Sequence, residues 1–285
     1  MTITYFQAIL TGFVQGITEL FPVSSLGHAV LLPAWMGGSW SEFTSNAESP
    51  YLPFTVFLHF ASALALFWVF RKRWIELIAS GLGSAKKRKT DAGRVFWLLV
   101  IATIPVGIIG LVFEHDLRVL FAKPLAASIF LTINGAILFT AEKLSRKRIE
   151  PTTGTPNEEI AEHITPKVAL SVGLGESLAL FAGISRFGVT TSVGLMRKLS
   201  HSIAADFAFL AALPVILAAA AYKIPEAMSS QYANMRPQMF VGAGVSFVAT
   251  YFSVQFLVRW FKTRTLYPFA IYCFAIGIIS IIKFA

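Results

Sequence analysis

The sequence predicts an all-α integral membrane protein, with about six transmembrane helices and two broken, re-entrant helix pairs arranged as an inverted repeat. Three observations lead to this prediction. Hydrophobic residues make up 55% of the 285 residues and charged residues only 14%, so most of the chain must face lipid or other helices. Two short polar motifs recur at a constant offset of 161 residues. Lys and Arg gather between alternate apolar segments.

Six apolar segments are long enough to cross a hydrocarbon core, which takes about 20 residues of helix. They are residues 52–70, 95–113, 124–141, 203–222, 239–258 and 266–282. Two other apolar segments, residues 3–32 and 167–196, are broken by Pro, Gly, Ser and charged residues. We expect each of these two to form a pair of short helices that enter and leave the membrane at one face. Non-helical backbone at that depth must line a cavity enclosed by protein.

The distribution of basic residues predicts the orientation. Eighteen of the 24 Lys and Arg lie in residues 71–94, 143–167, 197–198 and 259–264. The positive-inside rule places these connections in the cytoplasm and both chain ends outside. The two broken segments then enter from opposite sides, as an inverted repeat requires. We therefore predict a single membrane domain, residues 1–285, with halves at about 1–142 and 167–285 joined by a cytoplasmic loop.

The net charge of +9 does not indicate nucleic-acid binding, because the basic residues lie between apolar spans, where they meet anionic lipid headgroups. We predict a bilayer environment and no nucleic-acid partner, and we allow for a homodimer. The single cysteine, Cys273, excludes an intrachain disulfide and a cysteine metal cluster.

The first motif, residues 15–28, reads Gln-Gly-Ile-Thr-Glu-Leu-Phe-Pro-Val-Ser-Ser-Leu-Gly-His. Gln15 and Glu19 share a helix face because they are four residues apart. Ser24 or Ser25 can attack phosphorus if a base, His28 or Glu19, takes the hydroxyl proton. Glu19 can equally hold a divalent cation. The structural alternative is that the serines bond to carbonyls one turn earlier and that the histidine is interfacial.

The second motif, residues 176–191, reads Glu-Ser-Leu-Ala-Leu-Phe-Ala-Gly-Ile-Ser-Arg-Phe-Gly-Val-Thr-Thr, and the offset pairs its Arg186 with Ser25. A guanidinium near the bilayer midplane costs about 2.5 to 3.5 kcal/mol unless an anion or a carboxylate meets it. The forked guanidinium fits a pair of phosphate oxygens. The structural alternative is that Arg186 pairs with Glu19 or Glu176 and locks the two halves together.

The string Gln-x-x-x-Glu followed by Pro-Val-Ser-Ser-x-Gly-His, with Gly-x-Ser-Arg-x-Gly-x-Thr in the second half, resembles the undecaprenyl-diphosphate phosphatase family of bacitracin-resistance type. Further similarity begins at His59, Ile104, Ala141, Phe207 and Pro268, so the resemblance covers nearly the whole chain. It implies hydrolysis of polyprenyl diphosphate to the monophosphate and phosphate, which recycles the lipid carrier of peptidoglycan and cell-wall synthesis. It also implies the bacterial plasma membrane, with the site open to the external face.

The resemblance assigns Ser25 as nucleophile, His28 and Glu19 as acid-base or metal-binding neighbours, and Arg186 as the diphosphate clamp. It places substrate contacts at Gln15, Ser24, Gly27, Gly183, Ser185, Gly188 and Thr190. It implies a divalent cation, magnesium or calcium, held by Glu19 and Gln15.

The chain departs from the family pattern at three positions. Gln15 stands where many members have Glu, Ala182 replaces a common Pro, and Phe187 replaces a common Ser. We expect Phe187 to remove a phosphate ligand and to narrow the pocket.

Two other classes of protein fit parts of the pattern. A polyprenyl-phosphate translocase (flippase) would use the same anion site, because inverted repeats with broken helices are also a transporter architecture. It would need Arg186 but no serine nucleophile. A small-anion or proton-coupled transporter should carry ionisable residues along its spans, and only His59 and Glu142 are available, so we rank it last.

Overall fold

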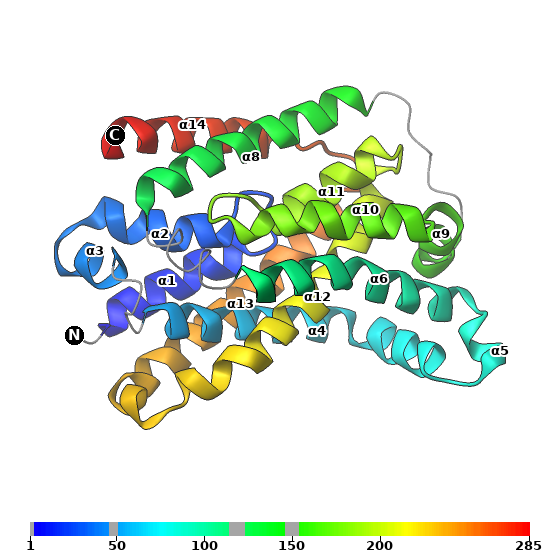
Figure 1. Ribbon diagram of the computed structural model, residues 1–285, viewed down its shortest axis with the longest axis horizontal. Coiled ribbons are helices and arrows are strands. Elements are labelled where there is room, and N and C mark those ends of the chain that lie inside the picture. Colours follow the sequence, from blue (N-terminus) through cyan, green and yellow to red (C-terminus); the bar gives the residue numbers. More distant parts are fainter. Residues whose placement is uncertain (1–2, 46–50, 114–122, 146–153) are drawn as a thin grey trace.

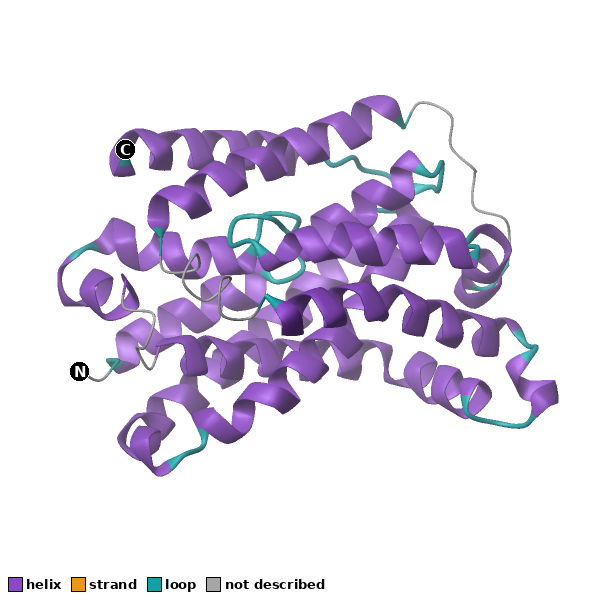
Figure 2. Cartoon of the chain, viewed as in Figure 1, coloured by secondary structure: helices purple, strands orange, loops and turns teal. Residues whose placement is uncertain are grey.

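The computed structural model describes residues 3–45, 51–113, 123–145 and 154–285, and every regular element in these ranges is a helix (Figures 1 and 2). The predicted all-α class is therefore confirmed. The helices of the first part are α1 (Tyr5–Thr18), α2 (Ser25–Met36), α3 (Gly38–Ser45), α4 (Tyr51–Gly81), α5 (Ala85–Arg88), α6 (Asp91–Val112) and α8 (Pro124–Leu144). Those of the second part are α9 (Pro156–His163), α10 (Pro166–Glu176), η1 (Ser177–Leu180), α11 (Arg186–Met196), α12 (His201–Ala227), η2 (Ser230–Met235), α13 (Arg236–Trp260) and α14 (Tyr267–Phe284).

In the described part of the chain, six helical segments are long and apolar enough to span a membrane, and each contains most of one predicted span. They are α4, α6, α8, α12, η2 with α13, and α14. The prediction ended the first span at residue 70, whereas α4 continues to Gly81. The extra turns are held by packing, because Trp74 and Leu77 are buried in the cluster that contains Val95 of α6.

Each broken segment contains a pair of short α-helices, as predicted, and the second also contains the 3-10 helix η1 between α10 and α11. Helix α1 begins with a capping box, in which the Thr4 hydroxyl accepts from Gln7 N and the Gln7 side chain bonds back to Thr4 N. Helices α2 and α11 begin with serine caps, Ser24 accepting from Gly27 N and Ser185 from Gly188 N, both at 3.1 Å. The first residues of α2 and α11 are therefore separated by the same 161 positions as the motifs.

Glycines let these short helices approach the long ones at backbone distance. Helix α1 packs on α13 and α10 packs on α6. A Cβ at Gly12 would overlap the carbonyl oxygen of Gly242, and a Cβ at Gly173 would overlap that of Ala102. Gly12 and Gly173 are equivalent positions of the repeat, so in both halves a glycine allows a short helix to contact the backbone of a long one.

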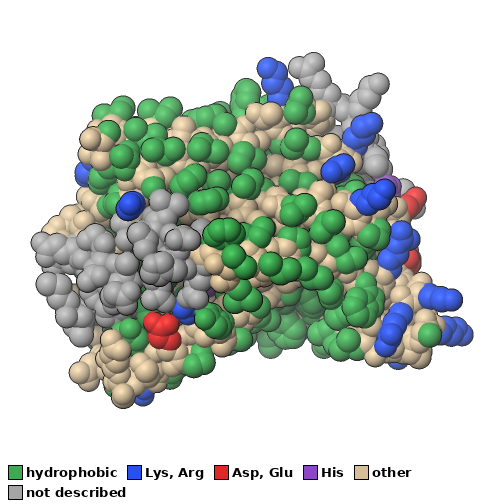
Figure 3. Space-filling view, in the orientation of Figure 1, with side chains coloured by type: hydrophobic (Ala, Val, Ile, Leu, Met, Phe, Trp, Pro, Cys, Tyr) green, Lys and Arg blue, Asp and Glu red, His purple; other side chains and the backbone are tan. Residues whose placement is uncertain are grey.

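The helices run along the length of the molecule (Figure 1). Helix α1 begins and α14 ends at the end of the molecule that carries α3, whereas α5 and α9 lie at the opposite end. Helices α1 and α2 extend from the middle of the molecule towards the end with α3. Helices α10 and α11 extend from the middle towards the end with α5 and α9. Lys and Arg gather at the end with α5 and α9, and apolar side chains cover the surface between the ends (Figure 3). This pattern fits an integral membrane protein. The inverted relation of the two halves stays a prediction.

The close approach of α10 to α6 predicts that Gly173→Ala destabilises the protein. The added methyl group must push two helix backbones apart, and overpacking of this kind costs about 1 to 3 kcal/mol. The melting temperature of the purified protein in detergent should fall. Gly107→Ala on α6 is the control, because nothing lies within 4 Å of its Cβ. Equal melting temperatures for the two variants would contradict this packing.

Candidate functional site

The turns that follow α1 and η1 meet in the middle of the molecule, where loop segments lie among the helices (Figure 2). The Ser24 hydroxyl accepts a second hydrogen bond, from Gly183 N at 3.1 Å, and the Ser185 hydroxyl donates to the carbonyl of Phe21 at 3.3 Å. Gly183 has φ 113°, a conformation that favours glycine. Each of the two serines therefore caps its own helix and also makes a hydrogen bond to the turn of the other half.

Asn134 of α8 joins the same two turns. Its Nδ2 donates to the Pro22 carbonyl and its Oδ1 accepts from Ser185 N, both at 2.9 Å. The side chain is fully buried. One amide thus satisfies a backbone acceptor of the first turn and a backbone donor of the second.

Beside these turns, Glu19 is the centre of a buried polar cluster. Its Oε2 accepts from Gln15 Nε2 at 2.7 Å and from Ser25 Oγ at 2.6 Å. The same oxygen lies 2.8 Å from Nδ1 of His59, which α4 contributes. With its proton on Nδ1, the His59 ring donates to the carboxylate. Three side chains from three helices therefore converge on one carboxylate oxygen.

Arg186 brings positive charge to this cluster from the first turn of α11. Its Nε lies 3.7 Å from Oε1 of Glu176, while its Nη1 is buried without a hydrogen-bond partner within the described ranges. One small cavity is lined by Glu19, Ser24, Ser25, Leu26, His59, Ala179, Ile184, Ser185 and Arg186. Its volume is about 10 Å³, roughly the space of one water, so the cluster is closed around its own side chains.

The structure brings together most of the predicted site residues. Gln15, Glu19, Ser25 and Arg186 lie in or beside the cluster, and Ser24 and Ser185 line it as helix caps. Gly27, Gly183 and Gly188 contribute backbone N–H groups to those two serines. The Thr190 hydroxyl is buried and has no hydrogen-bond partner among the described residues.

His28 does not face Ser25. Its Nδ1 lies 2.7 Å from the Ser24 carbonyl oxygen and its Nε2 lies 2.7 Å from the Tyr272 hydroxyl, with the two rings stacked. The hydroxyl of Ser25 therefore has Glu19, not His28, as its proton acceptor in this structure.

Phe187 does not narrow the site as expected. Its ring is buried against Phe209 and Phe261, with ring centroids 4.6 and 5.5 Å away, and it does not line the cluster cavity. The residue after Arg186 faces the core because consecutive helical residues point about 100° apart.

The sequence reasoning missed the roles of His59 and Asn134. Both are polar residues within predicted spans, and such residues at membrane depth usually have a specific partner. That signal was available, but the sequence did not identify the partners, because His59 and Asn134 lie far from both motifs along the chain.

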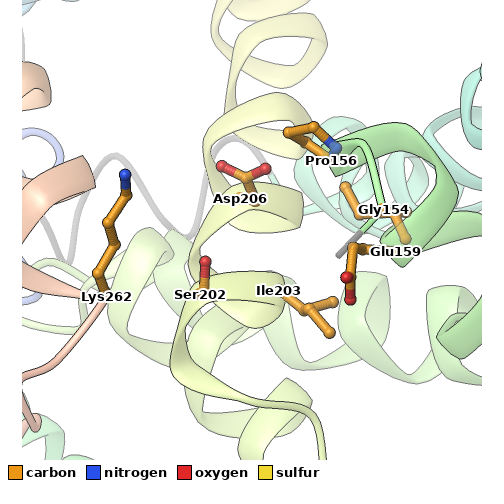
Figure 4. Close-up of a pocket in the computed structure, with 8 residues that line it drawn as sticks. Gly154, Pro156, Glu159, Ser202, Ile203, Asp206 and Lys262 are labelled. Atoms are coloured by element: carbon orange, nitrogen blue, oxygen red, sulfur yellow. The ribbon is translucent and has the colours of Figure 1, made fainter. Parts of the chain in front are cut away.

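A larger cavity, of about 390 Å³, lies between α9 and α12 at the end with α5 (Figure 4). Glu159, Asp206 and Lys262 line it, and Arg73 donates to Asp206 at 2.8 Å. It contains none of the motif residues. The central cluster is therefore the candidate active site.

The central cluster has too few ligands to hold a divalent cation by itself, and it could hold one only if an anionic substrate supplied further oxygen ligands. Within the described ranges no group of three or more His, Cys, Asp and Glu side chains could hold a metal. Glu19 and Gln15 offer a carboxylate and an amide on one helix face. Magnesium and calcium prefer oxygen donors, and magnesium is commonly bound by one or two carboxylates together with substrate phosphates.

Comparison with known proteins gives one consistent result. The family model described as bacitracin resistance protein BacA matches residues 8–279. "Undecaprenyl-diphosphatase 2" of Frankia alni is 45% identical, over 99% of this chain and 98% of that protein. "Undecaprenyl-diphosphatase" of Mycolicibacterium paratuberculosis is 43% identical, over the same shares of the two chains. "Undecaprenyl-diphosphatase 2" of Chromobacterium violaceum is 36% identical, over 97% of each chain.

The bridge made by Asn134 predicts that Asn134→Leu destabilises the fold. The change leaves the Ser185 N–H buried without its partner, at about 1 to 3 kcal/mol, and leaves the Pro22 carbonyl with only the weak 3.8 Å contact from the Cys273 thiol. The melting temperature in detergent should drop well below that of Ser128→Ala. Ser128 is equally buried on α8 but bonds only within its own helix, to the Pro124 carbonyl. Equal melting temperatures would show that the bridge contributes little.

Proposed function

The chain belongs to the bacitracin resistance protein BacA family, and from that premise we propose that its central cluster hydrolyses undecaprenyl diphosphate to undecaprenyl phosphate and inorganic phosphate. The reaction recycles the lipid carrier of cell-envelope synthesis. The observation that carries the assignment is the 2.6 Å hydrogen bond from Ser25 Oγ to Glu19, with the guanidinium of Arg186 at the same cavity. Hydrolysis through a serine nucleophile needs a hydroxyl paired with a base, whereas a translocase needs only the cation.

Arg186 binds the diphosphate in this proposal. Its buried Nη1 is without an acceptor within the described ranges, and a guanidinium fits two phosphate oxygens at once. Helices α2 and α11 both begin at the cluster, so their free N-terminal amides add donors for an anion. Because the closed cavity holds about 10 Å³, the headgroup must displace side chains when it enters.

Ser25 attacks the terminal phosphorus while Glu19 takes its proton. The bond from phosphorus to the bridging oxygen breaks, and the lipid monophosphate leaves with the proton that Glu19 took, which frees the carboxylate for the next step. Water, deprotonated by Glu19, then attacks the phosphoserine, which restores the Ser25 hydroxyl and releases inorganic phosphate. Gln15 and His59 hold the Glu19 carboxylate towards the serine by sharing its Oε2.

We also propose a divalent cation, magnesium or calcium, held by Glu19 and Gln15 with phosphate oxygens of the substrate. When bound, it would neutralise charge that develops on the diphosphate. Gln15 in place of a carboxylate leaves the protein with one anionic ligand on this helix face, so we expect weaker metal affinity than a paired carboxylate gives.

The location within the cell is part of the same proposal. Several apolar helices and the family membership place the chain in a membrane. We propose the bacterial plasma membrane, with the basic end near α5 and α9 in the cytoplasm and the site open to the opposite, external face (Figure 3).

The decisive test is release of inorganic phosphate from undecaprenyl diphosphate by the purified protein in detergent, with and without a chelator. We expect chelator-sensitive release by the wild type and a loss of at least about 100-fold in Arg186→Ala, because a charge-stabilising donor of the transition state is gone. Arg186→Lys, which keeps the positive charge but lacks the forked guanidinium group, should retain partial activity. Full activity of a folded Arg186→Ala protein would exclude the clamp, and full activity with chelator would exclude the cation.

The different contacts of the two adjacent serines predict different defects. Ser25→Ala should lower kcat by more than about 10³-fold at an unchanged melting temperature, because the nucleophile is removed. Ser24→Ala should mainly lower the melting temperature, because Ser24 caps α2 and accepts from Gly183 N. Near-normal turnover by Ser25→Ala would replace the serine mechanism by direct attack of water with Glu19 as base.

A further inference from the structure

Glu176, the last residue of α10, is the most enclosed charged side chain near the cluster. Its exposed fraction is 0%, and neither carboxylate oxygen accepts a hydrogen bond within the described part of the chain. The mechanism above does not use it. A buried carboxylate without hydrogen bonds is costly, so it needs a compensating charge. The cation nearest to it in the structure is Arg186.

The contact between the two side chains is incomplete. The distance of 3.7 Å from Arg186 Nε to Glu176 Oε1 is too long for a hydrogen bond, whereas a well-formed guanidinium–carboxylate pair has bonds of about 2.7 to 2.9 Å. Arg186 Nη1 is likewise without an acceptor among the described residues. The two charges therefore compensate each other, while the hydrogen-bonding capacity of both groups stays available for another partner.

The repeat shows that this incomplete contact is specific to the second half. Gln15 is the equivalent of Glu176, 161 positions earlier, near the end of the first helix of its pair. Gln15 bonds to Glu19 at 2.7 Å and lies 2.8 Å from His59 Nδ1. One equivalent position thus holds a neutral amide hydrogen-bonded to Glu19, and the other holds a carboxyl group without hydrogen bonds among the described residues, beside the anion clamp.

We propose that Glu176 is the resting counter-ion of Arg186, which the substrate diphosphate displaces and which recovers the guanidinium when inorganic phosphate leaves. This inference rests on the proposed function. A guanidinium at membrane depth requires an anion whenever substrate is absent. A carboxylate that makes no hydrogen bond to it is a weaker partner than a phosphate that makes two, so substrate can replace it. The same negative charge lowers the affinity for product phosphate and speeds its release.

Glu176→Gln tests this exchange, because it removes the charge and keeps the shape. In the purified full-length protein, we expect inorganic phosphate to bind at least fivefold more tightly by calorimetry. For undecaprenyl diphosphate, KM should fall and kcat should fall with it, since product leaves more slowly. Glu176→Asp keeps the charge and should retain the phosphate affinity of the wild type. Glu159→Gln, a buried carboxylate at the remote cavity, is the matched control and should change none of these values (Figure 4).

Each outcome decides the proposal. Unchanged or weaker phosphate binding by folded Glu176→Gln would overturn it, because a purely structural glutamate would lower stability or kcat without tightening anion binding. Failure of both Glu176→Gln and Glu176→Ala to fold would assign a structural role and would also overturn it. If the wild type releases no phosphate from undecaprenyl diphosphate but Glu176→Gln binds phosphate more tightly, the counter-ion role stands and the proposed hydrolysis fails.

Discussion

Two turns interrupt the helical backbone in the middle of an apolar molecule, and the remaining structure depends on how their free backbone groups are satisfied. Where water is excluded, an unpaired N–H or C=O costs several kcal/mol, so each group needs a protein partner. Each turn supplies hydrogen-bond partners for backbone groups of the other. Ser24 accepts from Gly183 N, Ser185 donates to the Phe21 carbonyl, and Asn134 completes the set from α8. Neither half could keep its break without the other.

This mutual satisfaction also creates the site. Because the two turns must touch, the side chains that follow them are brought together, with Ser25 at the start of α2 and Arg186 at the start of α11. The glycines that let α1 and α10 lie directly on neighbouring backbones keep these short helices close to the long ones. A hydroxyl, a carboxylate and a guanidinium thus share one enclosed cavity of about 10 Å³. In so small a space the electrostatic interactions are stronger than in water.

The two halves use equivalent positions for different chemistry. The first supplies the hydroxyl and the Glu19 carboxylate, and the second supplies the Arg186 guanidinium at the same cavity. The equivalent residues Gln15 and Glu176 differ in the same way. In the first half Gln15 is an amide with a hydrogen bond to Glu19, and in the second half Glu176 is a carboxylate without hydrogen bonds in the described part of the chain. A strictly symmetric site would place like charges opposite one another, so the departure from symmetry lets one cavity both activate a nucleophile and bind an anion.

The sequence by itself determined the all-α membrane class, the six spans, the two broken segments and the residues of both motifs. Hydropathy, chain length and the repeated offset can be read directly from the order of residues, so one sequence is enough to predict what depends on them. Only the tertiary structure decided the partners. It turned His28 towards Tyr272, directed Phe187 into the core, and brought His59 and Asn134 from distant helices to Glu19 and to the turns. It also decided which of two adjacent serines faces the carboxylate. Such choices depend on how long helices pack in three dimensions, and a motif does not encode that packing locally.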